Sequence, residues 1–89
     1  MATSILEELP QDGVAKSMAR ALAAANTAAE ARGADLAASV VTITEESAPP
    51  ERVWRIHYGP RDYRNRRGGD LIVLVDEQTA AVRRVIRGQ

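Results

Sequence analysis

The sequence predicts an α+β domain in which one N-terminal helix packs on a four-stranded antiparallel meander, in the order αββββ. Three observations lead to this fold class. Apolar residues recur at three- and four-residue spacing between residues 14 and 32. The apolar period then changes to two, which is typical of half-buried strands. Proline, glycine and aspartate separate the successive apolar runs, as expected of turns and loops.

The helix is expected to follow a flexible N-terminal arm, residues 1–11, and to open the single domain of residues 12–89. Asp12 is the expected N-cap, and Gly33 is the expected residue at the C-terminal cap. The apolar stripe between them consists of Val14, Met18, Ala21, Leu22, Ala25 and Ala29. Such a narrow, alanine-lined stripe suits close packing across a sheet.

The strands follow in four segments. In SVVTITEE, Val41 and Ile43 alternate with threonines, and RVWRIHYGP shows the clearest alternation in the chain. In that second segment one side carries Trp54, Ile56 and Tyr58, and the other carries Val53, Arg55 and His57. LIVLVD is almost continuously apolar, which indicates a central strand, and AVRRVIRGQ contains the last strand. Because one helix covers one face only, we expect the second face to be polar, pressed against a partner, or both.

A tight reversal is expected between the last two strands, in DEQTAA. Asp76 and Thr79 can accept hydrogen bonds from backbone amides there.

Composition points to a small domain with a thin core. The chain has 89 residues, no cysteine and only three aromatic residues, Trp54, Tyr58 and Tyr63. Neither disulfides nor thiolate metal sites can add stability, so a partner or a second copy is a reasonable supplement, and a homodimer that pairs its uncovered sheet faces is one expectation. No segment resembles a membrane span or a signal peptide, so we expect a cytoplasmic protein, or a periplasmic one if a leader has been removed.

Charge is divided unevenly along a chain of zero net charge. Residues 1–50 carry three basic and seven acidic residues, a net charge of −4, and residues 51–89 carry nine and five, a net charge of +4. The halves either complement each other in the folded domain or create a basic binding face.

A metal site and an enzyme active site are both disfavoured. His57, Asp70 and Asp76 are the metal-ligand candidates, but the two aspartates lie at opposite ends of one strand, roughly 20 Å apart at 3.3 Å per residue. His57 is the single evident base, and no serine stands in a nucleophile motif. Gly68 and Gly69 precede a strand rather than a helix, so they do not form a phosphate loop. We therefore predict no cofactor, no metal and no catalytic residue.

An arginine cluster remains as the candidate binding feature. Its residues are Arg61, Arg64, Arg66 and Arg67 with Tyr63 among them, in the loop RDYRNRRGGD. Interspersed acids, zero net charge and the absence of an RNA-binding motif argue against nucleic acid. Arginine and tyrosine are enriched at protein interface hot spots, so a protein partner with an acidic patch is the preferred interpretation. Arg55 and His57, on the second sheet face, are expected to join the contact.

The C-terminal half resembles a known family. The residues that carry the resemblance are Trp54 to Pro60, Gly68 to Asp70, Val73 to Asp76, Thr79, and Val82 to Gln89. They are similar to small bacterial immunity proteins with a nuclear-transport-factor-like or cystatin-like fold, over roughly residues 50–89. Ala80 departs from the glycine usual in the family's turn, and alanine in a left-handed turn costs on the order of 1 kcal/mol.

The resemblance implies a non-catalytic module that neutralises a cognate toxin by steric occlusion. Two alternatives stay open. One is a PepSY-like accessory or inhibitory domain that binds an enzyme or ligand at the cell envelope. The other is a small cone-shaped α+β enzyme that uses His57.

Overall fold

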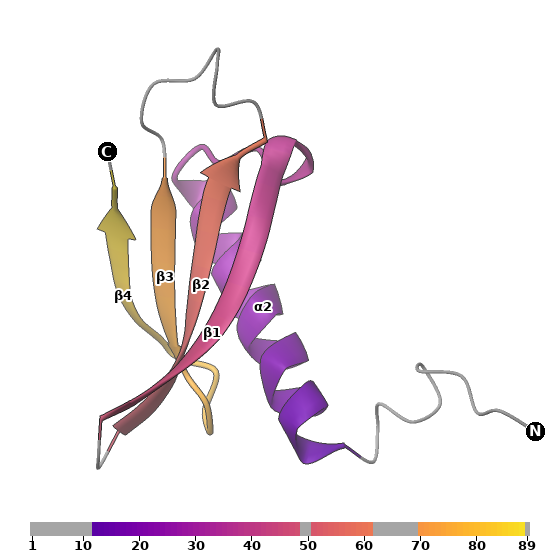
Figure 1. Ribbon diagram of the computed structural model, residues 1–89, viewed down its shortest axis with the longest axis vertical. Coiled ribbons are helices and arrows are strands. Elements are labelled where there is room, and N and C mark those ends of the chain that lie inside the picture. Colours follow the sequence, from indigo (N-terminus) through magenta and orange to yellow (C-terminus); the bar gives the residue numbers. More distant parts are fainter. Residues whose placement is uncertain (1–11, 49–50, 62–69, 89) are drawn as a thin grey trace, which may run out of the picture.

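The computed structural model describes residues 12–48, 51–61 and 70–88. Its elements are α2 (Gly13–Ala31), the short 3-10 helix η2 (Leu36–Ala38), β1 (Ser39–Ala48), β2 (Glu51–Pro60), β3 (Leu71–Asp76) and β4 (Val82–Arg87). The strands form one antiparallel sheet in the order β1-β2-β3-β4, and α2 lies across one of its faces (Figure 1). The predicted αββββ fold class is confirmed. The predicted arm of residues 1–11 lies outside the described residues.

Both predicted helix caps are present. The Asp12 side chain accepts a hydrogen bond of 3.0 Å from the backbone N–H of Ala15, so it satisfies one of the donors left unpaired at the helix start. At the other end Gly33 has a φ of +87° and donates its N–H to the carbonyl of Glu30. This left-handed conformation just past the cap is easily reached only by a residue without Cβ, and it ends the helix.

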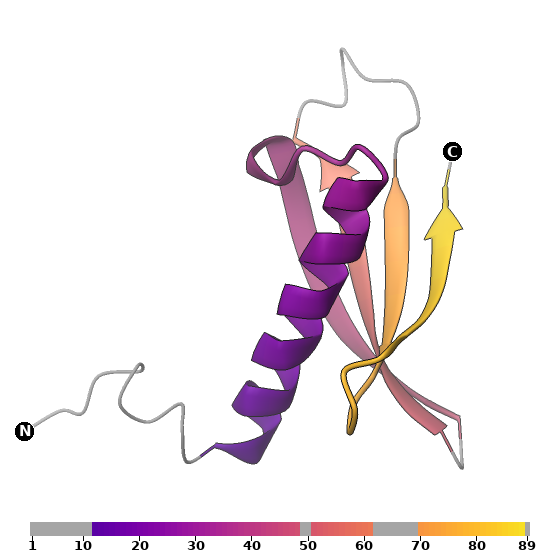
Figure 2. The ribbon, with the colours of Figure 1, turned by 180° about the vertical axis from the view of Figure 1, so that it is seen from behind.

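The helix packs through alanines, as the apolar stripe predicts, except at its first turn. Ala21, Ala25 and Ala29 are buried, and Met18 and Leu22 pack against them. Val14 is 62% exposed, so its assignment to the buried stripe is wrong. The physical reason is the diagonal path of α2, whose first turn lies beside the sheet rather than over it (Figure 2). Helical periodicity identifies a face but does not say where the opposing sheet ends.

The sheet register places the core between β2, β3 and the helix. Ile56 stands opposite Val73, and Trp54 stands opposite Val75. Both central strands bury alternate residues: Trp54, Ile56 and Tyr58 from β2, and Leu71, Val73 and Val75 from β3. The predicted alternation of β2 and the central position of β3 are therefore confirmed. The helix contacts β2, β3 and β4, whereas β1 lies largely clear of it.

Two polar anchors join the helix to the sheet. The indole N–H of Trp54 donates to Ser17 Oγ at 2.8 Å, and that hydroxyl donates in turn to the carbonyl of Glu77 at 2.8 Å. The Tyr58 hydroxyl donates to Asn26 Oδ1 at 2.7 Å. Burial, and secondarily the negative charge of Glu30, raises the pKa of Tyr58 to about 12. These bonds satisfy the polar atoms of two largely buried aromatic side chains.

The turn between β3 and β4 forms as predicted. Asp76 Oδ1 accepts from the backbone N–H groups of Gln78 and Thr79, and Thr79 Oγ1 accepts from Ala81. Ala80 has a φ of 59°, so the turn keeps its left-handed residue even without glycine.

Candidate functional site: the open face of the sheet

The sheet face opposite α2, called the open face below, carries no helix within the described part of the chain (Figures 1 and 2). Strand alternation places every second residue of each strand on it. Its residues are Val40, Thr42, Thr44 and Glu46 from β1; Val53, Arg55 and His57 from β2; Ile72, Leu74 and Asp76 from β3; and Arg84 and Ile86 from β4. The predicted site residues Arg55 and His57 therefore lie on one surface, side by side along β2.

Apolar side chains form the middle of the open face. Ile72 lies between His57 on β2 and Ile86 on β4 in one cross-strand row. In the next row Leu74 lies between Arg55 and Arg84. Ile72 and Leu74 are partly buried although no element of the described part of the chain covers them. The face thus combines an apolar centre with polar and charged flanks.

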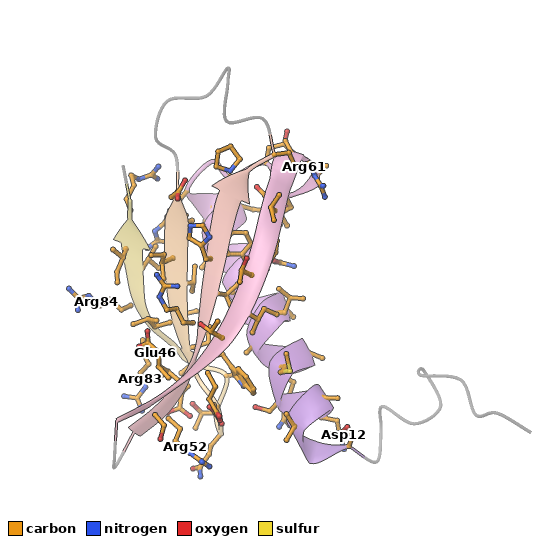
Figure 3. The ribbon with its side chains drawn as sticks, viewed as in Figure 1. Asp12, Glu46, Arg52, Arg61, Arg83 and Arg84 are labelled. Carbon is orange, nitrogen blue, oxygen red and sulfur yellow. The ribbon has the colours of Figure 1, made fainter. Side chains whose placement is uncertain are left out.

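Charged groups of the open face form ion pairs with residues of neighbouring strands, one of which is Arg83 at the register irregularity of β4. Arg55 Nε lies 3.5 Å from Glu46 Oε1, a loose pair between half-exposed side chains. Arg83 Nη2 donates to Asp76 Oδ2 at 2.7 Å. This bond, together with the backbone amides of Thr79 and Gln78, holds the pKa of Asp76 well below its usual range. Arg84 makes no ion pair with a described residue, and Figure 3 shows it projecting from β4 away from the sheet.

A histidine–aspartate pair lies at the end of the open face where β3 begins. His57 Nε2 is 2.9 Å from Asp70 Oδ2, and the two side chains are 24% and 27% exposed. Because a carboxylate only accepts, Nε2 carries the hydrogen. Gly88 holds Asp70 from the other side: its N–H donates to the Asp70 carbonyl at 2.7 Å, and a Cβ on Gly88 would approach Asp70 Cβ to 3.1 Å.

The sequence did not reveal this pair, although it contains the necessary signal. In the observed register Asp70 lies diagonally across from His57, because His57 stands opposite Ile72 and both aspartate and isoleucine face the same side. Pairing the second and third predicted strands in that register would have found it.

The remaining predicted site residues lie elsewhere. Arg61 is exposed at the end of β2, where its backbone N–H donates to the carbonyl of Ala38 and its Nε to that of Ala37. It stands beside the start of β1 rather than on the open face (Figure 3). Tyr63, Arg64, Arg66 and Arg67 lie outside the described residues.

Cavities lined by described residues lie on the helix side of the sheet, and the two below are not lined by His57. One, of about 180 Å³, is at the C-terminal end of α2 and is bordered by Tyr58, Leu71 and Arg87. The other, of about 400 Å³, is beside the first turns of α2 and is bordered by Trp54, Glu45, Arg52 and Glu77. Burial, and secondarily the neighbouring Glu45, raises the pKa of Glu77.

Among the described residues, no group of three or more histidine, aspartate or glutamate side chains is arranged to hold a metal ion. No helix within the described ranges is long and apolar enough to cross a membrane.

Comparison of the chain with protein-family models, with curated proteins and with solved structures found no match. The similarity to immunity proteins therefore stays a prediction.

Proposed function

We propose that the chain is a non-catalytic protein-binding module that docks its open face on a partner protein, in the manner of an immunity protein that occludes a toxin. The observation that carries this proposal is the uncovered apolar centre of the open face, Ile72 and Leu74, flanked by Arg55 and Arg84. An apolar centre with arginines at its rim is the composition of a protein interface.

The charges of the open face favour a partner with acidic groups. Two of its carboxylates are already engaged, Asp70 by His57 and Asp76 by Arg83. Arg84 has no carboxylate partner among the described residues. The Arg55–Glu46 pair is loose, so Arg55 can replace Glu46 with a carboxylate of the partner. A partner that places a carboxylate near these arginines would gain affinity and faster association.

The experiment is co-expression with the product of the neighbouring gene. Arg84→Glu reverses an exposed charge, and Leu74→Glu places a charge in the apolar centre. We expect both variants to lose co-purification and to leave cells unprotected. Thr27→Glu, on the exposed side of α2, is the matched control and should behave as the native chain. Retained binding by both open-face variants, with folding verified by circular dichroism, would remove the basis of the proposal.

A small enzyme is the second candidate, and the His57–Asp70 hydrogen bond is the observation that favours it. Asp70 fixes the hydrogen on Nε2, which leaves Nδ1 of a neutral imidazole able to accept a proton. Neither of the two cavities described above is lined by His57, so they do not supply this base with a substrate pocket. His57→Gln and Asp70→Asn separate the candidates: an enzyme loses turnover in a substrate screen, whereas a binding module keeps its partner. The PepSY-like alternative stays a prediction.

A further inference from the structure

The two edge strands of the sheet differ in how they are protected. β4 has six residues, carries Arg83, Arg84 and Arg87, and departs from regular register beside Leu74 and Val75. A short, charged edge with a register irregularity is a common way to prevent pairing with another chain. β1 has ten residues, and its first six, SVVTIT, contain no charge, proline or glycine.

The first part of β1 also exposes an apolar side chain on each of its faces, whereas Ile43 further along packs against the core. Val40 is 45% exposed and Val41 is 40% exposed, and because they are adjacent their side chains point to opposite faces. The helix lies largely clear of this strand. β1 therefore presents its outer backbone groups together with one exposed valine on each face, which is the arrangement an added strand would complete.

We propose that β1 is a strand-pairing surface whose occupant is β1 of a second copy, joined antiparallel about a two-fold axis at Thr42. This surface is the outer backbone edge of β1, whereas the open face is made of side chains, to which Thr42 and Thr44 of β1 also contribute. The proposal does not depend on the identity of any partner. Because the pairing extends the sheet in its own plane, both open faces lie on the same side of the dimer and remain accessible.

The side chains of β1 favour this register. With the axis at Thr42, each Thr44 stands opposite Val40 of the other copy, and each Ile43 stands opposite Val41. These are β-branched pairs of the kind that stabilise antiparallel strands. Shifting the axis to Ile43 would place Glu45 opposite Val41, and shifting it to Val41 would leave Ile43 opposite Ser39. The axis at Thr42 pairs seven residues, Ser39 to Glu45, with no like charges opposed.

The charges at the two ends of β1 are complementary in the same register. Glu45 of one copy stands opposite Ser39 of the other, and the adjacent Glu46 reaches the region of Ala38. Arg61 is bound to the carbonyls of Ala37 and Ala38, so its guanidinium lies at the start of β1. Figure 3 shows Arg61 and Glu46 toward opposite ends of the sheet, as a two-fold pairing between copies requires. Each dimer therefore brings the Glu45–Glu46 end of one strand to Arg61 of the other.

Cysteine crosslinking tests the register directly, because the chain has no cysteine of its own. Opposed Cα atoms in an antiparallel pair are about 4.5–5.5 Å apart, within the range of a disulfide. We expect Thr42→Cys to form a covalent dimer under mild oxidation. Ser47→Cys is the matched control on the same strand: its two copies would lie about 33 Å apart at 3.3 Å per residue. It should stay uncrosslinked.

Sedimentation velocity of the full chain tests the association itself. We expect a concentration-dependent dimer whose dissociation constant rises at least about tenfold in Thr42→Lys, because two lysines then face each other across the axis. Thr27→Lys, on the exposed side of α2, should leave the dimer unchanged.

Several results would overturn the proposal. One is a native chain that stays monomeric up to high micromolar concentration, including a monomer whose β1 accepts a strand of another protein. Equal crosslinking of Thr42→Cys and Ser47→Cys would also contradict it. So would a dimer that survives Thr42→Lys and dissociates in Leu74→Glu, because that dimer pairs open faces.

Discussion

The two faces of the sheet use the same strands in opposite ways. On the helix side, alternate residues of β2 and β3 are buried under alanines of α2. The polar atoms of Trp54 and Tyr58 donate hydrogen bonds to side chains of the helix. On the open face, apolar residues lie between charged ones, and the charges other than Arg84 form ion pairs. Because burial on the helix side stabilises the fold, the residues of the open face are not constrained by packing against the helix.

The largest expected difference between the faces comes from isoleucine truncation. Ile56 on β2 is 0% exposed beneath the helix, so Ile56→Ala should lower the free energy of unfolding by about 2–5 kcal/mol. Ile72 on β3 is only partly buried on the open face, and Ile72→Ala should cost roughly 1 kcal/mol. Urea denaturation of both variants measures the contrast. Equal losses would mean that the open face is part of the core.

A smaller effect is expected at the polar anchor between helix and sheet. Ser17→Ala removes the acceptor of the Trp54 indole N–H and leaves that donor unpaired in a buried site. We expect a loss of about 1–3 kcal/mol in the free energy of unfolding. Thr27→Ala is the control, because Thr27 bonds only to its own helix on the exposed side, and it should change stability by less than about 0.5 kcal/mol. A Ser17 variant as stable as this control would show that the anchor contributes nothing.

The covered face could be predicted from the sequence because it depends on local patterns. The alternation around Trp54, the caps at Asp12 and Gly33, and the turn at Asp76 each involve residues close together in the chain. They therefore follow from local sequence preferences that agree with the fold as a whole. The same holds for Ala80, whose left-handed conformation follows from the turn around it.

The open face and the edges could not be predicted to the same depth, because they depend on register and on element positions. The His57–Asp70 bond requires the pairing of β2 with β3, and the exposure of Val14 and Val41 requires the path of the helix over the sheet. Periodicity identifies which residues share a face but not which of them an opposing element covers. Four of the seven predicted binding residues, Tyr63, Arg64, Arg66 and Arg67, lie outside the described residues.

The smallest expected effect concerns the charged pair of Asp76 and Arg83 at the turn end of the open face. In the folded protein the pKa of the Asp76 carboxyl is lowered, chiefly by its hydrogen bond with Arg83. A depressed carboxyl pKa contributes stability that is present above the unfolded value of about 3.9 and is lost as the pH falls through the folded value. Asp76→Asn should therefore be less stable than the native chain at pH 7, and the difference should vanish in strong acid.

Arg83→Gln tests the stated cause of the shift without altering Asp76 itself. The carboxyl keeps its backbone donors, Gln78 and Thr79, but loses the guanidinium. We expect the pKa of Asp76, followed by carboxyl NMR titration, to move up toward its ordinary range while staying below it, because the two amides still favour the ionised form. An unchanged pKa would assign the shift to the turn alone. The loss of stability in acid at this end of the sheet would then be caused by the backbone amides of the turn and not by the ion pair with Arg83.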